Sequence, residues 1–470
     1  MKPPISGPIL IVGGGPAGLG AASELHRLGF DDWLLFEADD APGGLSRSFV
    51  DDRGCTWDIG GHIVFSHYDR YTRVLDGLFG ADGWLEHQRE TYVRLCREWI
   101  PYPLQNNLHR LPPAERARCV EGLFQARRGP APPDENFDDY VVRTFGPGIA
   151  ELFMRPYNFK VWAHPLTAIG TDWLADRVAA PDLDRIARNL ELNRDDVGWG
   201  PNNAFRVPRA GGTGAIWRAL AASLPATKVR YGAEVVGVDV GRKIVTLANG
   251  ETHGYERLIA TAPLDRLAGW TGRRAWIDAA AKLVHTSTHV VGVGLTGAVA
   301  PERRTTCWMY FPEDDAPFYR VTHFSFYSPQ NVPDIRTGWS LMGEVSESPA
   351  KPVDGARLVD DVVRGLHAVG LIESPAQVTH TWSRRVEYGY PIPTPDAGRV
   401  GGELLRELMK CDIWSRGRFG AWRYEVGNMD HCFMQGVEAA GHLLVGSPEL
   451  TVWHPAAVNA PHPRERAGQR

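Results

Sequence analysis

At 470 residues the chain is longer than one hydrophobic core usually supports, so two or three structural domains are expected. Its 43% hydrophobic and 23% charged residues are ordinary for a globular protein. A net charge of −5 gives no reason to expect a nucleic acid or an anionic membrane surface as a partner.

The cysteines and the apolar runs indicate the compartment. None of the six cysteines forms a CxxC pair, which favours thiols in a reducing cytoplasm over a disulfide framework or a zinc site. The first expected strand begins too early to leave room for a signal peptide, and no apolar run approaches the ~20 residues that span a bilayer. We therefore expect a cytoplasmic enzyme without a membrane segment.

The N-terminus carries a dinucleotide-binding pattern. Ile9–Val12 is wholly apolar, as in a parallel strand buried on both faces. Gly13-x-Gly15-x-x-Gly18 follows at once, and a helix is expected over 21–28. The glycines let the backbone turn tightly and approach a pyrophosphate, which binds at the helix N-terminus.

The following residues select the dinucleotide. Trp33–Phe36 is a second expected strand, and Glu37 lies nineteen residues after Gly18, where an acid binds the ribose hydroxyls. Gly43 and Gly44 then give the backbone a second close approach, a pattern similar to that of FAD-dependent amine oxidases and carotenoid desaturases. The alternative is a plain NAD-binding domain with an incidental Gly-Gly turn.

Helices and strands alternate in blocks along the rest of the chain. Amphipathic patterns predict helices over 114–126, 137–145, 149–157 and 183–191. Strands are predicted over 228–231, 234–240, 243–247, 258–262, 289–295, 306–310, 320–327 and 339–346, and a last helix over 432–442 whose N-terminus points at the flavin.

These blocks predict an α/β fold in which a Rossmann-like FAD-binding domain is assembled from separate pieces. The expected FAD-binding domain comprises 1–90, 210–275 and 425–470. A helical substrate domain over 107–200 and an antiparallel sheet domain over 91–106 and 280–424 are inserted between them.

Five ordered motifs narrow the family. They run over Asp58–Tyr68 (DIGGHIVFSHY), Trp99–Asn107, Arg155–Ala163, Trp308–Asp314 and Trp414–Asp430. Together they resemble the UDP-galactopyranose mutases, and the eukaryotic-type branch more than the usual bacterial one. The resemblance covers nearly the whole chain.

The resemblance implies an isomerase that interconverts pyranose and furanose forms of a nucleotide-bound hexose. In that family, N5 of reduced FAD attacks the anomeric carbon and expels the nucleoside diphosphate. The covalent flavin–sugar adduct opens, and another hydroxyl closes the ring. NADH or NADPH reduces the flavin, and Arg89, Thr91 and Arg418 match the nicotinamide contacts.

The same resemblance assigns the site residues. Arg177 and Arg320 match the diphosphate-binding arginines, which can hold phosphate oxygens bidentately. His62, Arg418 and Asn428 match flavin-lining positions, and the cofactor-binding set is Gly13, Gly15, Gly18, Glu37, Gly43, Gly44, Gly61 and Met429. The substrate-binding set is Phe65, Tyr102, Leu104, Gln105, Asn158, Trp162, Asn202, Trp308, Tyr310, Tyr390 and Tyr424.

Leu104 stands where the eukaryotic-type enzymes carry an aromatic residue against the uracil. If leucine simply packs against the uracil, UDP-galactose, which the family converts to the galactofuranose form, remains the leading substrate. The changed pocket makes a GDP-hexose such as GDP-L-galactose the alternative. The chain also lacks that branch's longer C-terminal tail, so a homo-oligomer is an open expectation.

Two other functions share the fold. One is an amine oxidase or desaturase-like oxidoreductase, which predicts an apolar tunnel or an amine cage. The other is an inert FAD-binding protein. The competent residues at every flavin-facing and phosphate-facing position argue against it.

Overall fold

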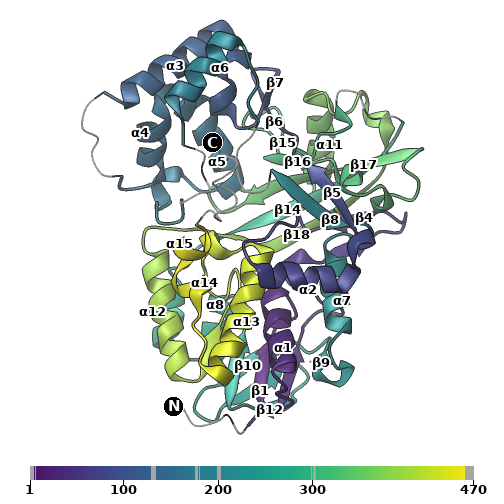
Figure 1. Cartoon of the computed structure of the whole chain (residues 1–470), viewed down its shortest axis with the longest axis vertical. Coiled ribbons are helices and arrows are strands. Elements are labelled where there is room, and N and C mark those ends of the chain that lie inside the picture. The colour runs from purple at the N-terminus through teal and green to yellow at the C-terminus, as the bar shows by residue number, and fades with distance from the viewer. Residues whose placement is uncertain are drawn as a thin grey trace.

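The computed structural model describes residues 5, 7–128, 134–174, 178, 180–197, 203–297, 299 and 303–460. It shows a mixed α/β flavoprotein fold in which helices α3 to α6 gather apart from the nucleotide-binding part, with a large sheet between them (Figure 1). Figure 1 places the nucleotide-binding part around α1, α12 and α13.

A parallel five-stranded sheet forms the base of the nucleotide-binding part. Its order is β19-β13-β1-β2-β9. The strands are β1 (Ile9–Val12), β2 (Trp33–Phe36), β9 (Val229–Arg230), β13 (Arg257–Ala260) and β19 (Ile413–Ser415). All four residues of β1 are buried, as the apolar run predicts.

Strand β19 corrects the predicted domain limits. It lies inside 280–424, which we assigned to the antiparallel domain, yet Ile413 pairs in parallel with Leu258 of β13. Its side chains Ile413 and Trp414 are buried in the two cores on either side of the parallel sheet. Burial on both faces therefore places this segment in the nucleotide-binding sheet.

Helices and small sheets surround this base. The helices are α1 (Pro16–Arg27), α2 (Asp69–Phe79), α7 (Gly214–Ala222), α8 (Leu264–Thr271), α9 (Arg274–Ala280), α12 (Ala397–Lys410), α13 (Met429–Val445), α14 (Leu450–Trp453) and α15 (Pro455–Val458). The small sheets pair β3 (Ser48–Val50) with β4 (Thr56–Asp58), β5 (Trp84–Gln88) with β8 (Ala204–Pro208), and join β10 (Val235–Asp239), β11 (Ile244–Leu247) and β12 (Thr252–Gly254).

A seven-stranded sheet forms the second part, in the order β18-β14-β17-β16-β15-β6-β7. Its strands are β6 (Thr91–Leu95), β7 (Glu98–Pro101), β14 (His285–Thr296), β15 (Trp308–Tyr310), β16 (Arg320–Thr322), β17 (Gly338–Glu347) and β18 (Val378–Pro391). Neighbouring strands are antiparallel except β15 and β6, which run parallel. Helix α11 (Leu358–Ala368) packs into the apolar core of this sheet.

The strand predicted over 320–327 is only half correct. Strand β16 ends at Thr322, and Phe324–Tyr327 forms the short helix α10. Phe324 and Tyr327, three residues apart, therefore point into the same core cluster, which an alternating strand would not allow.

The third part is helical. It contains α3 (Pro113–Ala126), α4 (Phe137–Ile149), a π-helical turn (Ala150–Met154), α5 (Arg155–Trp162) and α6 (Leu183–Leu192). Their apolar faces share one core with β6, β7 and the 3₁₀ segment Leu104–Arg110. Among the described residues, no helix is long and apolar enough to cross a membrane.

Helices α1 and α13 lie side by side although they come from opposite ends of the chain (Figure 1). The helix predicted over 21–28 starts earlier, at Pro16, and includes Gly20. A Cβ at Gly20 would lie 2.2 Å from the carbonyl oxygen of Phe433, and one at Gly436 would lie 1.8 Å from that of Ala17. The glycines therefore permit backbone contact between the two helices.

We expect Gly436→Ala to force α1 and α13 apart and to lower the free energy of unfolding by about 1–3 kcal/mol. Because the N-terminus of α1 moves with the helix, bound flavin per chain should also fall. Gly269→Ala is the matched control, since Gly269 is helical and exposed and a Cβ added to it would meet nothing within 4 Å. The thermal unfolding midpoint and the flavin content measure both effects; equal results for the two variants would contradict the packing argument.

Candidate active site

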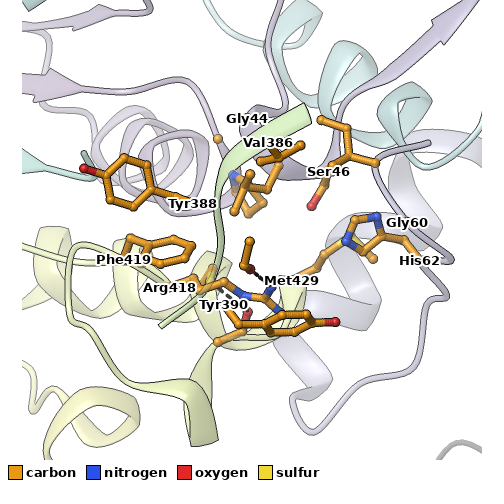
Figure 2. Close-up of a pocket in the computed structure, with 18 of the residues that line it drawn as sticks. Gly44, Ser46, Gly60, His62, Val386, Tyr388, Tyr390, Arg418, Phe419 and Met429 are labelled. Carbon is orange, nitrogen blue, oxygen red and sulfur yellow. Dashed lines mark hydrogen bonds between the residues drawn. The ribbon is translucent and has the colours of Figure 1, made fainter. Parts of the chain in front are cut away.

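A cavity of about 660 Å³ lies where the parallel sheet meets the seven-stranded sheet. The nucleotide-binding part contributes Gly13, Gly15, Glu37 and Gly44 to its wall. The other wall comes from β16, β17, β18 and the segment before α13. Figure 2 shows His62 and Gly60 on one side of the cavity, and Tyr388 and Phe419 on the opposite side.

The two glycine loops fit a dinucleotide. The amide of Gly43 donates to the carbonyl of Gly14, and a Cβ at Gly44, whose φ is +50°, would lie 3.3 Å from the Cα of Gly15. A side chain at Gly44 would therefore crowd this approach. Gly18 does not line the cavity; a Cβ there would meet the carbonyl of Gly13, so it serves the packing of helix on strand.

Glu37 is at the end of β2, on the cavity wall. Its carboxylate accepts the amides of Gly14 and Asp39, which fixes its orientation. Burial raises the pKa of Glu37 despite these two bonds. Its role at a ribose hydroxyl remains a prediction.

His62 carries the clearest sign of a ligand-binding role. It lines the cavity, and its buried Nδ1 has no hydrogen-bond partner in the part of the chain that the structure describes. Burial, and then the charges of Arg418 and Arg320, lower the pKa of His62 to about 4. The imidazole is therefore neutral near pH 7 and offers one donor and one acceptor.

Arg418, Asn428 and Met429 close the same end of the cavity, next to the N-terminus of α13. Figure 2 shows Arg418 beside Tyr390 and Met429. Arg418 donates to the carbonyl oxygens of Gly427 (2.9 Å) and Gly389 (3.3 Å). Among the described residues it has no carboxylate within salt-bridge distance, so its positive charge is directed at the cavity and the backbone alone.

Arg320 lines the cavity from β16, as predicted, but one edge of its guanidinium is already occupied. Its Nε and Nη2 each donate to Glu344 of β17 at 2.7 Å. The geometry leaves Nη1 and the outer hydrogen of Nη2 for a phosphate. A bidentate grip on the Nε edge, the most rigid mode, is thus unavailable in this arrangement.

Glu344 is a site residue that the sequence analysis missed. Its carboxylate also accepts the hydroxyl of Tyr319 (2.7 Å) and the amide of Gly61 (3.1 Å). Burial opposes ionisation, but the charge and hydrogen bonds of Arg320, together with Tyr319 and Gly61, hold the pKa of Glu344 below its ordinary value. A charged residue inside the apolar segment 339–346 was the available signal.

Aromatic side chains continue the site away from the cavity. Tyr390 and Tyr424 line the cavity, and the ring of Trp162 lies 5.8 Å from the former and 4.7 Å from the latter. Tyr102 packs on Tyr310 at 5.4 Å. The expected nucleoside and phosphate residues therefore lie in one aromatic cluster.

Several predicted substrate residues are placed within this cluster rather than on the cavity. Leu104 is fully buried in the helical core, and Asn158 donates to the carbonyl of Met154. Trp308 donates its indole N–H to the hydroxyl of Tyr310 at 2.7 Å. Gln105, next to Leu104 in the chain, is also buried. Phe65 differs from these residues because it lines the cavity.

Other predicted positions lie apart or outside the described residues. Arg177 and Asn202 fall outside the residues that the structure describes. Arg89 and Thr91 are buried near Tyr102 and do not line the cavity. Their roles toward a nicotinamide remain predictions.

Comparison with known proteins decides the family. A model of the flavin-containing amine oxidoreductases matches residues 16–444. The chain belongs to this family. It is a flavoprotein enzyme, which excludes the plain NAD-binding domain.

The crystal structure of a reduced UDP-galactopyranose mutase is similar over almost the whole chain. The two are 47% identical with a TM-score of 0.94, and the match covers 97% of this chain and 98% of that one. The predicted resemblance to the UDP-galactopyranose mutases is confirmed. Structures of lower sequence identity show a likeness in fold alone.

Two such structures are a putative protoporphyrinogen oxidase from Exiguobacterium sp. 255-15 and a CLA-producing fatty acid isomerase from P. acnes. Both are 15% identical to this chain and cover 94% of it, with TM-scores of 0.72 and 0.64; the match covers 100% and 99% of those chains.

We expect Glu344→Gln to lower the free energy of unfolding by about 3–5 kcal/mol, because it leaves the charge of Arg320 without its buried partner. Glu347→Gln, on the same strand, is the control. Glu347 pairs with Arg385, whose side chain is 51% exposed, and such a pair is worth about 1 kcal/mol or less; a glutamine there still has an oxygen for its contact with His289. Thermal unfolding of both variants measures the difference. If the two variants had the same unfolding midpoint, the buried pair of Glu344 and Arg320 would contribute no more to stability than the exposed pair.

Proposed function

We propose that this enzyme interconverts the pyranose and furanose forms of a nucleoside-diphosphate hexose, with UDP-galactose as the leading substrate. The observation that carries the proposal is that Arg320 and Arg418 lie on the wall of the same cavity as the two glycine loops and Glu37. The 47% identity to a UDP-galactopyranose mutase supports it.

The cavity residues have separate proposed roles in binding the cofactor and the leaving diphosphate. The two glycine loops and Glu37 would hold FAD, which in its reduced form would supply the nucleophile for the anomeric carbon. Arg320, through Nη1, and the hydroxyls of Tyr390 and Tyr424 receive the leaving diphosphate. Hydrogen bonds from these donors stabilise the charge that develops as the glycosidic bond breaks.

Arg418 and His62 act on the flavin side. The charge of Arg418, which no carboxylate among the described residues neutralises, favours the anionic reduced flavin. Neutral His62 presents a hydrogen-bonding nitrogen without adding a second cation. Glu344 holds Arg320 and the amide of Gly61 together, so the diphosphate end and the flavin end keep a fixed spacing.

Activity should require reduced flavin but consume no stoichiometric reductant, with NADH or NADPH as the priming reductant. Dithionite-reduced enzyme should convert UDP-galactofuranose to UDP-galactopyranose over many turnovers, measured by anion-exchange chromatography. Equal turnover by the oxidised enzyme in air, or one nicotinamide consumed per product, would instead indicate an oxidoreductase or another mechanism.

In the same assay Arg320→Ala should lose about 2–4 kcal/mol of transition-state stabilisation, a roughly thirtyfold to thousandfold drop in turnover, while retaining flavin. Arg177→Ala is expected to behave alike. Arg206→Ala is the control, because Arg206 is paired with Asp76 and stacked on Trp84 outside the cavity.

The base is a separate question, because Leu104 replaces an aromatic residue. Tyr102 and Trp162 still offer aromatic surface, which can stack on any base. Discrimination between uracil and guanine must therefore come from hydrogen bonds to the edge of the base. We expect the reduced enzyme to bind UDP more tightly than GDP in calorimetric titrations. A preference for GDP would move the substrate to a GDP-hexose such as GDP-L-galactose without changing the chemistry.

A further inference from the structure

Three metal-binding side chains meet at a point outside the flavin cavity. Asp51 and Cys55 belong to the turn between β3 and β4, and His380 lies near the start of β18. One donor atom from each lies within 4.8 Å of the others. None of the three lines the cavity described above.

Hydrogen bonds fix the carboxylate of Asp51. Its Oδ1 accepts the amides of Arg53 and Cys55, both at 2.9 Å. Its Oδ2 accepts the indole N–H of Trp57 at 2.7 Å and lies 3.1 Å from Nε2 of His380. Oδ2 therefore keeps a lone pair directed toward His380, and the turn holds it there.

The imidazole of His380 is held with equal precision. Its Nδ1 lies 3.0 Å from the hydroxyl of Thr379, while Nε2 is buried and has no well-aligned hydrogen-bond partner among the described residues. Gly294 faces His380 across β14 and β18, and a Cβ there would lie 2.0 Å from the ring. Thr379 and Gly294 thus leave Nε2 as the nitrogen that can bind a ligand.

We propose that Asp51, Cys55 and His380 form a binding site for Zn²⁺ or a similar divalent transition metal. A thiolate, an imidazole and a carboxylate are the ligands that Zn²⁺ takes in proteins. A tetrahedral ion with Zn–N and Zn–O bonds near 2.0 Å separates those two atoms by about 3.3 Å, close to the 3.1 Å between Nε2 and Oδ2. Water would fill the fourth position.

The charges balance when the ion binds. Cys55 is a buried free cysteine, and it would bind the ion as a thiolate. Binding replaces the S–H proton, which passes to solvent, and the thiolate and carboxylate together neutralise the two positive charges of the ion. The bonds of Asp51 to backbone amides and Trp57 act as the supporting hydrogen bonds of a metal ligand.

The site would connect two parts of the molecule. Trp57 of β4 stacks on Trp382 of β18 at 6.1 Å with an interplanar angle of 7°. Strand β4 continues directly into Gly60, Gly61 and His62 on the cavity wall. A metal at Asp51, Cys55 and His380 would therefore fasten the hairpin that leads to the flavin-facing turn onto the seven-stranded sheet.

The experiment uses untagged, flavin-loaded protein that has been treated with a chelator and then titrated with CoCl₂. Tetrahedral Co²⁺ should give ligand-field absorption bands at longer wavelengths than the flavin, saturating at one equivalent and displaced by ZnCl₂. Zn²⁺ should also raise the thermal unfolding midpoint. X-ray absorption of the Zn²⁺-loaded wild-type protein should show one sulfur ligand and nitrogen or oxygen ligands for the rest.

Cys55→Ser and His380→Gln should each abolish the Co²⁺ bands, whereas Cys96→Ser, which removes a thiol outside the cluster, should keep them. Flavin content tests whether each variant is folded. If a variant does not fold, the X-ray absorption of the wild-type protein decides, because it needs no substitution. Absence of the bands in wild-type protein, a zinc site without sulfur, or bands that persist in folded Cys55→Ser would overturn the proposal.

Discussion

The carboxylate of Glu344 is the point at which the two halves of the site are joined. It is buried on β17, and its two oxygens accept four hydrogen bonds from three residues, Arg320, Tyr319 and Gly61. A charge at this depth is stable only when it is paired and its lone pairs are satisfied. Glu344 therefore fixes the distance between Arg320 and the turn before His62, so that a displacement of one also moves the other.

This spacing suits a reaction in which two events occur at once. In the proposed reaction, the diphosphate would leave at the end of the cavity lined by Arg320, and the sugar would react at the end lined by His62. Arg320 is on a strand of the seven-stranded sheet, and Glu344 of the same sheet binds the amide of Gly61 next to His62, so both ends are tied to one sheet. The cost is that half of the Arg320 guanidinium is used for structure.

The connectivity of the chain explains why the cavity lies between its parts. The parallel sheet takes strands from near residue 9 and from near residue 413, and α13 packs on α1. The two inserted parts thus leave from and return to the same sheet. Strands of the seven-stranded sheet face the carboxyl ends of β1 and β2 across the cavity, where nucleotides bind in such sheets.

The sequence by itself determined the local features of this protein. The buried strand Ile9–Val12, the glycine loops, Glu37 and the family motifs are set by a few neighbouring residues, whose backbone preferences and periodicity act over short distances. Cavity-lining His62, Arg418 and Arg320 were found through such motifs. The long helices and most strands followed from the same short-range patterns.

Only the tertiary structure decided which distant residues meet. The pairing of Ile413 with Leu258, the contact of Glu344 with Gly61 and Arg320, and the grouping of Asp51 and Cys55 with His380 all join segments far apart in the chain. Neither hydrophobic period nor spacing encodes such contacts, because they depend on how strands order themselves in a sheet and on which side chains share one buried volume. A charge in an apolar strand shows that a partner must exist, and the folded chain alone shows which partner it is.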